Sequence, residues 1–278
     1  MLDRLGDGVS RFAVGERVTV NPNVYCGYCQ YCLPGRLILC ENAKGLGSNF
    51  PGFSAEYVTV PHTLVFSVEG MAKDTTVFTG PQRARCMARK RCRSGRARAP
   101  WSSAPGPPGL LLAQLIATGG ASSVTVAAPT KLKLDTATAL GVDRTVQINR
   151  NDIEGNLRRL REAPRGDGYD VVVEATGSTT VGEMCVPLTR NGGTVMIYGV
   201  TRGDETMRFH PFDVFRREIT IKGSLAEMTS FSAAIDALRT GLVKTDGIIT
   251  HRFSPDDYGK ALDALRTDPS AHKVVIAP

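Results

Sequence analysis

The second half of the chain alternates short apolar runs with segments whose apolar residues recur at helical spacing. The apolar runs at residues 123–127, 145–148, 170–175, 194–198 and 218–222 predict buried strands. Helices are predicted between them at residues 109–117, 131–140, 153–161 and 181–188. Strands that alternate with helices in this way imply right-handed crossovers and a parallel, doubly wound sheet. A sixth strand is expected near residues 98–103, although Trp101-Ser102-Ser103 is short and polar for a buried strand.

The two ends of the chain have other patterns. Residues 231–242 and 255–266 predict amphipathic helices, and residues 273–276 predict a closing strand. Near the N-terminus, four cysteines (Cys26, Cys29, Cys32 and Cys40) lie within fifteen residues. Four thiolates at this spacing favour one tetrahedral zinc ion, and because all four ligands are protein sulfurs the site would be structural. Two disulfides or scattered core thiols are the alternatives, and they are less typical of a chain of this length.

The cysteine spacing resembles the structural-zinc lobe of the zinc-containing medium-chain alcohol and polyol dehydrogenases. Residues 14–18 before the lobe and 52–57 after it resemble the barrel strands of that family, and the resemblance resumes near Gly109 and continues to the C-terminus. It implies an α/β fold with a partial GroES-like β-barrel domain and a Rossmann-type sheet. The implied domains are residues 1–79 (GroES-like, with the zinc lobe), 109–242 (NAD(P)-binding) and 243–278 (a return to the first domain, with the closing strand completing the barrel begun near Phe12).

Composition supports an ordinary globular protein. The 278 residues are 42% hydrophobic and 22% charged, and no run approaches the roughly 20 apolar residues of a membrane span. Reduced cysteines and an N-terminus without a signal pattern lead us to expect a cytoplasmic protein. The resemblance implies a small alcohol or polyol as partner, and a homo-oligomer is compatible with it.

The net charge of +7 comes from one segment. Residues 83–98 carry eight Lys and Arg residues and no carboxylate, and subtracting these eight charges from +7 leaves −1. A basic arm for nucleic acid is one interpretation, but aromatic residues for base stacking are missing from the run. We favour the hypothesis that residues 80–108, which lack helical or strand periodicity, come from a GC-rich gene read out of frame between two compensating indels.

Glycines at strand ends indicate where a dinucleotide would bind. In the stretch that begins at Ala104, Gly106 and Gly109 hold the second and third positions of a phosphate-binding loop, but prolines within it remove N–H donors. The resemblance implies that two further stretches flank the nicotinamide nucleotide; their residues are Thr176, Gly177, Tyr198, Gly199 and Val200. Ordinary turn glycines are the alternative. At the end of the second strand, residues 127–131 lack the acidic residue that would hold the ribose of NAD, and Lys131 follows closely. This pattern favours NADP, and a solvated first-turn lysine is the alternative for Lys131.

The catalytic chemistry is the weakest part of the sequence interpretation. The family's catalytic Cys and its Gly-His-Glu motif would lie before Met1, so the resemblance implies an N-terminally truncated member without a catalytic zinc. The four histidines (His62, His210, His251 and His272) have no metal-ligand spacing. The expected parent reaction is oxidation of an alcohol or polyol with NAD(P), similar to sorbitol and threonine dehydrogenases. The alternatives are a non-catalytic, zinc-stapled protein with at most weak nucleotide binding and, less favoured, a nucleic-acid binder through residues 83–98.

Overall fold

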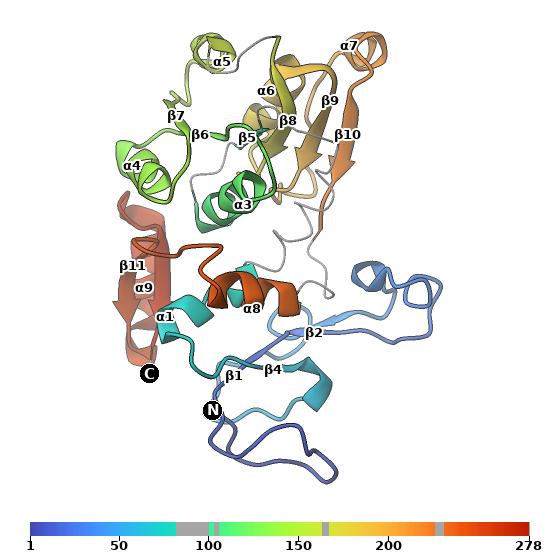
Figure 1. Cartoon of the computed structure of the whole chain (residues 1–278), viewed down its shortest axis with the longest axis vertical. Coiled ribbons are helices and arrows are strands. Elements are labelled where there is room, and N and C mark those ends of the chain that lie inside the picture. Colours follow the sequence, from blue (N-terminus) through green and yellow to red (C-terminus); the bar gives the residue numbers. More distant parts are fainter. Residues whose placement is uncertain (82–99, 103–105, 163–166, 226–230, 278) are drawn as a thin grey trace. The chain divides into compact units, whose positions relative to one another are not determined.

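The computed structural model describes residues 1–81, 100–102, 106–162, 167–225 and 231–277. The chain divides into two compact units (Figure 1). The first comprises Met1–Ala84 and Leu225–Gly241, and the second comprises Arg85–Ser224 and Leu242–Pro278. The boundaries of these two units differ from those of the predicted domains, and the domain division therefore remains a prediction. The basic run at 83–98 lies outside the described residues.

The first unit contains two small antiparallel sheets. Strand β1 (Val18–Val20) pairs with β4 (Val65–Ser67), and β2 (Asn23–Val24) pairs with β3 (Lys44–Gly45). Its described N-terminal part also contains the short helical turns η1 (Leu37–Leu39), η2 (His62–Leu64) and α1 (Lys73–Thr76). Helix α8 (Phe231–Arg239) belongs to this unit, because the ring of Phe231 lies 4.6 Å from that of Phe66 on β4.

The strands predicted on either side of the cysteines are only partly present. Of residues 14–18, only Val18 lies in a strand, since Gly15 forms a turn at φ +83°. Residues 52–57 contain no strand, so that prediction is wrong. An extended segment forms a strand only when a neighbour offers backbone partners, and no described strand pairs with this largely exposed segment.

The second unit is built on a six-stranded sheet in the order β10-β9-β8-β5-β6-β7, which runs from orange to green in Figure 1. All of its pairings are parallel. The strands are β5 (Pro100–Ser102), β6 (Thr125–Ala128), β7 (Arg144–Gln147), β8 (Tyr169–Glu174), β9 (Thr189–Ile197) and β10 (Thr220–Gly223). The helices between them are α3 (Pro107–Ala117), α4 (Lys131–Ala139), α5 (Ile153–Glu162), α6 (Thr179–Leu188) and α7 (Pro211–Arg216). The predicted doubly wound sheet is therefore confirmed.

Of the six strands, the central strand β5 had the least convincing sequence pattern. Strand β5 pairs with β8 through Trp101↔Val172 and with β6 through Trp101↔Thr125. Its two neighbours are fully buried strands, which supply backbone partners on both sides of a segment with little strand propensity of its own. From β5 the chain winds outward to β7 and then returns to β8, so the strand order reverses between β5 and β8.

A hydrophobic core secures the sheet to its helices. Leu160 of α5, Cys185 of α6 and Val172 of β8 are fully buried within one apolar cluster, together with Tyr169. The hydroxyl of Tyr169 donates to the backbone carbonyl of Leu160 at 2.9 Å, so its one polar atom is satisfied inside the core. The burial of both faces explains why the sequence of β8 reads as one apolar run.

The C-terminal segment adds a two-stranded parallel sheet of β11 (Ile249–Phe253) and β12 (Lys273–Ile276). The turn η4 (Pro255–Asp257) and helix α9 (Tyr258–Thr267) connect the two strands. Strand β11 was missed, although Ile249, His251 and Phe253 alternate with exposed residues. In the part of the chain that is described, β12 pairs with β11, and its return to complete the first domain's barrel remains a prediction.

Candidate functional site

The four cysteines converge as their spacing predicted. Their sulfur atoms all lie within 4.8 Å of one another. Cys26 Sγ lies 3.9 Å from Cys32 Sγ and 3.5 Å from Cys40 Sγ. A tetrahedral zinc ion with sulfur ligands has sulfur–sulfur edges of about 3.8 Å. Because a disulfide would hold two sulfurs at about 2.05 Å, these free thiols have the geometry of a four-sulfur metal site.

Backbone turns place the sulfurs. The N–H groups of Cys32 and Leu33 both donate to the carbonyl of Cys29, which closes a tight turn between two of the thiols. Gly27 and Gly35 have φ near +80°, a conformation that favours glycine, and they reverse the chain on each side of that turn. Cys29, Cys32 and Cys40 are buried against Tyr25, Tyr31 and Leu37, so the cluster is itself the core of the lobe.

Backbone N–H groups direct hydrogen bonds at the cysteine sulfurs. A hydrogen bond from the backbone of Glu41 lowers the pKa of Cys29. Burial raises the pKa of Cys32 to about 12. For Cys26, burial acts to raise the pKa, but hydrogen bonds from the backbones of Tyr28 and Cys29 outweigh it, and the pKa falls to about 6. Hydrogen bonds of this kind stabilise the thiolate, which is the form that ligates metal.

A cleft of about 560 Å³ lies within the second unit, at the carboxyl ends of the strands that flank the reversal of strand order. Open parallel sheets bind ligands at this position. Its lining comes from the ends of several strands and the starts of the following helices, and it includes Gly106, Pro129, Ile148, Thr176, Val181 and Met184. The cleft offers apolar walls together with backbone and hydroxyl groups, the usual composition of a small-molecule site.

The predicted phosphate loop reaches this cleft only in part. Gly106 lines the cleft and precedes α3, whereas Gly109 is buried inside the first turn of that helix. Pro107 and Pro108 occupy the first two helical positions, so Gly109 is the first residue of α3 that carries an N–H. An anion at this helix end would therefore meet fewer donors than an ordinary helix N-terminus offers.

The two other predicted stretches meet at the ends of β8 and β9. The two turns can approach closely because neither Gly177 nor Gly199 has a side chain. A Cβ atom on Gly199 would collide with the backbone nitrogen of Gly177 and with Glu174 Oε2. Tyr198 donates its backbone N–H to the Glu174 carbonyl at 2.8 Å, and Val200 is 88% exposed. The glycines thus have a packing role, and a contact with a nucleotide remains a prediction for these positions.

Glu174, which the sequence analysis did not select, organises these turns. Its carboxylate is fully buried, and Oε1 accepts hydrogen bonds from the Thr176 N–H at 2.6 Å, the Thr176 hydroxyl at 2.5 Å and the Gly177 N–H at 3.0 Å. Thr176 also lines the cleft, so the buried carboxylate fixes one wall of it. The sequence signal was available, because an acid at the end of an apolar strand has to be hydrogen-bonded when it is buried.

The predicted ribose-site lysine lies elsewhere than expected. The Lys131 ammonium pairs with Asp135 at 2.8 Å on an exposed turn of α4, and Lys131 is not part of the cleft lining. Two other cations, Lys133 and Arg150, do line the cleft. Lys131 and Lys133 are two residues apart, which is about 200° of rotation around the helix, so the two side chains leave α4 on nearly opposite sides.

The other candidate residues stay apart from these sites. Among the described residues, the cysteine cluster is the one group of three or more potential metal ligands. Cys185 lies in the core of the sheet, where burial, and secondarily the charge of Glu174, raises its pKa. None of the described helices combines the length and apolar character that a bilayer crossing requires.

Comparison with known proteins assigns both halves of the chain. Residues 1–70 match the model of the alcohol dehydrogenase GroES-like domain, and residues 107–240 match the model of the zinc-binding dehydrogenases. D-arabinitol dehydrogenase 1 of Uromyces fabae is 30% identical over 261 residues, which cover 94% of this chain and 74% of that protein. L-threonine 3-dehydrogenase of Escherichia fergusonii is 28% identical over 276 residues, covering 98% of this chain and 79% of that enzyme.

A solved structure agrees with these relatives. A zinc-binding dehydrogenase from Sinorhizobium meliloti 1021, crystallised with NADP, superposes with a TM-score of 0.88 at 28% identity and covers 99% of this chain and 80% of that one. The chain belongs to the zinc-containing medium-chain alcohol and polyol dehydrogenase family, which confirms the resemblance and the fold class inferred from its sequence.

Proposed function

We propose that this chain oxidises a small alcohol or polyol with NAD(P), and that a zinc ion bound by its four clustered cysteines has a structural role. The observation that carries the proposal is the cleft at the reversal of strand order, in a chain of this family. Membership supports the reaction class, because relatives named as arabinitol and threonine dehydrogenases cover nearly the whole chain.

The metal part of the proposal is supported by the donor set. Cys26, Cys29, Cys32 and Cys40 would hold the ion, and four thiolates leave no position for substrate. The ion would therefore fold the lobe, and it would not polarise an alcohol. A bound structural zinc contributes on the order of 10 kcal/mol to the folding of small domains, which exceeds what the few buried side chains of this lobe can contribute.

The nucleotide part is supported by the shape and chemistry of the cleft. The apolar side chains Ile148, Val181 and Met184 offer walls for an aromatic base, while Gly106 and Thr176 lie where sugar and phosphate groups need backbone approach and hydrogen bonds. A nicotinamide bound in the cleft would supply the hydride acceptor. Oxidation of a secondary alcohol to a ketone would transfer a hydride from the carbinol carbon to that nicotinamide and release the hydroxyl proton to water.

A second candidate is favoured by one observation. Pro107 and Pro108 remove two N–H donors from the start of α3, which lowers the affinity that this helix end can have for a pyrophosphate. A non-catalytic, zinc-stapled protein with at most weak nucleotide binding would have this feature. This candidate predicts zinc binding and at most weak dinucleotide binding, without oxidation of any polyol.

The test uses the full, zinc-loaded chain. Reduced-nicotinamide fluorescence on titration with NADPH and NADH measures binding, and a panel that includes arabinitol, sorbitol, butanediol and threonine measures formation of reduced cofactor. Binding with turnover of at least one substrate supports the dehydrogenase. Weak binding without turnover, or no binding, supports the second candidate and contradicts the dehydrogenase.

A further inference from the structure

A buried carboxylate without a counter-cation stands behind one wall of the cleft. Glu174 is fully buried at the end of β8, and no ion pair joins it to a cation in the part of the chain that is described. A buried charge has to be stabilised by hydrogen bonds when no opposite charge is near it. The donors that Glu174 engages are therefore withdrawn from any ligand.

The carboxylate collects the donors of the loop that follows it. Its Oε1 accepts from the Thr176 N–H, the Thr176 hydroxyl and the Gly177 N–H, at 2.6, 2.5 and 3.0 Å. The next N–H along the chain, that of Ser178, donates to Thr176 Oγ1 at 3.0 Å. Three consecutive N–H groups are thus directed at the protein's own oxygens. Because anionic groups bind through N–H and cationic donors, this loop has none to offer to a phosphate.

The hydroxyl of Thr176 has a defined direction. An ionised carboxylate only accepts hydrogen bonds, so the single hydroxyl hydrogen points to Glu174. A hydroxyl oxygen has two lone pairs, and one of them accepts the Ser178 N–H. One lone pair remains, and no hydrogen. Toward the cleft that Thr176 lines, its oxygen can therefore only accept a hydrogen bond.

The loop that carries Thr176 is tied at both ends. The Glu174 backbone carbonyl accepts from the N–H groups of Tyr198 and Gly199, at 2.8 and 2.9 Å. Ser178 is the N-cap residue of α6, and its carbonyl accepts from the Gly182 N–H at 2.9 Å. These bonds hold the loop between strand and helix, so the hydroxyl is oriented before a ligand arrives. Preorganisation of this kind reduces the entropy cost of binding.

We propose that Glu174 is a positioning residue: by taking the Thr176 hydrogen, it makes that oxygen an acceptor-only contact for the ligand of the cleft. The ligand group that meets it is a neutral donor, a hydroxyl or an amide N–H. A phosphate oxygen is disfavoured there, because two acceptors share no hydrogen. Glu174 is not part of the cleft lining and acts through Thr176. The inference rests on the proposed function, since it takes the ligand to be a dinucleotide.

A second buried acid on the same strand provides a matched control. Asp170, near the opposite end of β8, is 5% exposed and pairs with Arg190 at 2.6 Å. It does not line the cleft. Its neutralisation should lower stability without a change at the ligand, so it separates a structural role from a positioning role.

The experiment titrates the zinc-loaded full chain with NADH and NADPH, follows reduced-nicotinamide fluorescence, and uses the dinucleotide that binds more tightly. Thr176→Val should weaken binding about fivefold, as expected for the loss of one hydrogen bond, while Thr176→Ser should stay within about twofold. Glu174→Gln, which removes the charge that orients the hydroxyl, should also weaken binding about fivefold. Added to Thr176→Val, it should cost no more than about a further twofold, because the two residues act as one unit. Asp170→Asn should lower the Tm and keep the affinity within about twofold.

Each other outcome overturns the inference in a distinguishable way. Unchanged affinity of Thr176→Val would show that its oxygen does not meet the ligand. Additive losses in the double variant would show that Glu174 acts independently of Thr176. Equal losses of affinity in Glu174→Gln and Asp170→Asn would leave Glu174 with a structural role only.

Two further results have a defined meaning. If Glu174→Gln does not fold, Glu174→Asp, which keeps the charge and withdraws it by one methylene, takes its place in the same cycle with the same expected losses. If the parent chain binds neither dinucleotide, the proposed dehydrogenase function fails and the inference fails with it.

Discussion

The cysteine lobe and the six-stranded sheet reach order by different physical means. The lobe, residues 23–45, buries three cysteines and little else, and its aromatic and aliphatic side chains at Tyr28 and Leu33 are largely exposed. The sheet buries whole strands and the helices against them, so apolar contact alone can stabilise it. The difference predicts that the lobe depends on a bound ion to fold and that the sheet does not.

Removal of the proposed zinc should have the largest effect, and only in the lobe. Chelation, or Cys40→Ser, is expected to abolish protection of residues 23–45 against hydrogen exchange, because on the order of 10 kcal/mol of metal binding supports that fold. Strands β6 and β8 should keep their protection. Cys185→Ala provides the reverse control, since it removes a buried thiol from helix α6, which packs on the sheet, and should leave the zinc content unchanged. Equal loss of protection in both regions would contradict the separation.

A cavity in the sheet should produce the converse result. Leu160→Ala removes a fully buried side chain from α5 and is expected to cost about 2–5 kcal/mol of the sheet's unfolding free energy. Zinc content, measured by a colorimetric chelator, should not change. Leu265→Ala, on an exposed side chain of α9, should stay within about 0.5 kcal/mol of the parent in denaturant titrations.

The close approach of the two glycine turns can be tested at a single methyl group. Gly199→Ala would place Cβ against the Gly177 nitrogen and the buried Glu174 carboxylate, and we expect about 1–3 kcal/mol of destabilisation. Because the same turns position Thr176 in the cleft, nucleotide affinity should fall as well. Gly203→Ala has open space around it and is the control. Unchanged stability of Gly199→Ala would show that the turns can move apart.

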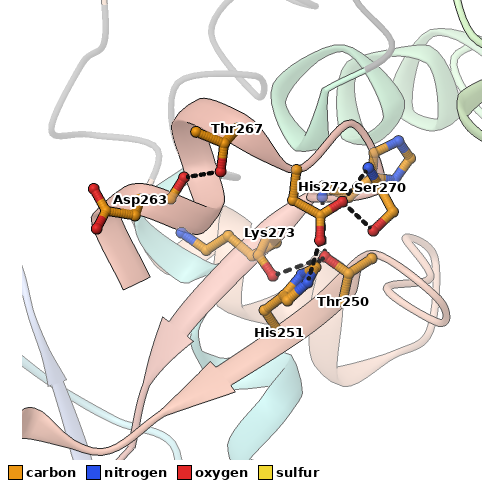
Figure 2. Close-up of polar contacts among 8 residues, drawn as sticks. Thr250, His251, Asp263, Thr267, Ser270, His272 and Lys273 are labelled. Atoms are coloured by element: carbon orange, nitrogen blue, oxygen red, sulfur yellow. Dashed lines mark hydrogen bonds and ion pairs between the residues drawn. The ribbon is translucent and has the colours of Figure 1, made fainter. Parts of the chain in front are cut away.

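The smallest effect is expected at the network between β11 and β12. Asp268 accepts from the Ser270 hydroxyl at 2.6 Å and contacts His251 Nε2 at 3.1 Å, while His251 Nδ1 lies 2.9 Å from Thr250 Oγ1 (Figure 2). Hydrogen bonds from the Ser270 side chain and backbone, with a further contribution from His251, lower the pKa of Asp268 below its ordinary 3.8.

A depressed carboxyl pKa stabilises the fold above the ordinary value, and that contribution disappears as the pH falls below about 4 and through the folded-state pKa. Asp268→Asn should therefore lower the Tm slightly at neutral pH, and its difference from the parent should shrink in acid. Asp263→Asn is the matched control, because only the backbone carbonyl of Asp263 takes part in the contacts of Figure 2. A difference that is constant with pH would exclude a role for the Asp268 charge.

Sequence reasoning succeeded where one local pattern determines the structure. The cysteine spacing predicted a cluster, and the apolar runs predicted every outer strand of the sheet. It was least certain for β5, whose order comes from β6 and β8 on either side, and it missed β11, whose alternation is weakened by polar residues. It also named Lys131 as the ribose-site residue, whereas Lys131 pairs with Asp135 on the exposed side of α4 and Lys133 lines the cleft. The rotation of α4 about its axis is set by the buried Leu134 and Ala137.

The most direct measurement of the central claim is hydrogen exchange of the zinc-loaded chain with and without saturating NADPH. The account predicts new protection in the cleft-lining segments at residues 129–133, 148–156 and 175–184, with no change in the lobe at residues 23–45. Absence of protection in the cleft, or protection confined to the lobe, would contradict the assignment of cofactor binding to the sheet and of metal binding to the cysteines.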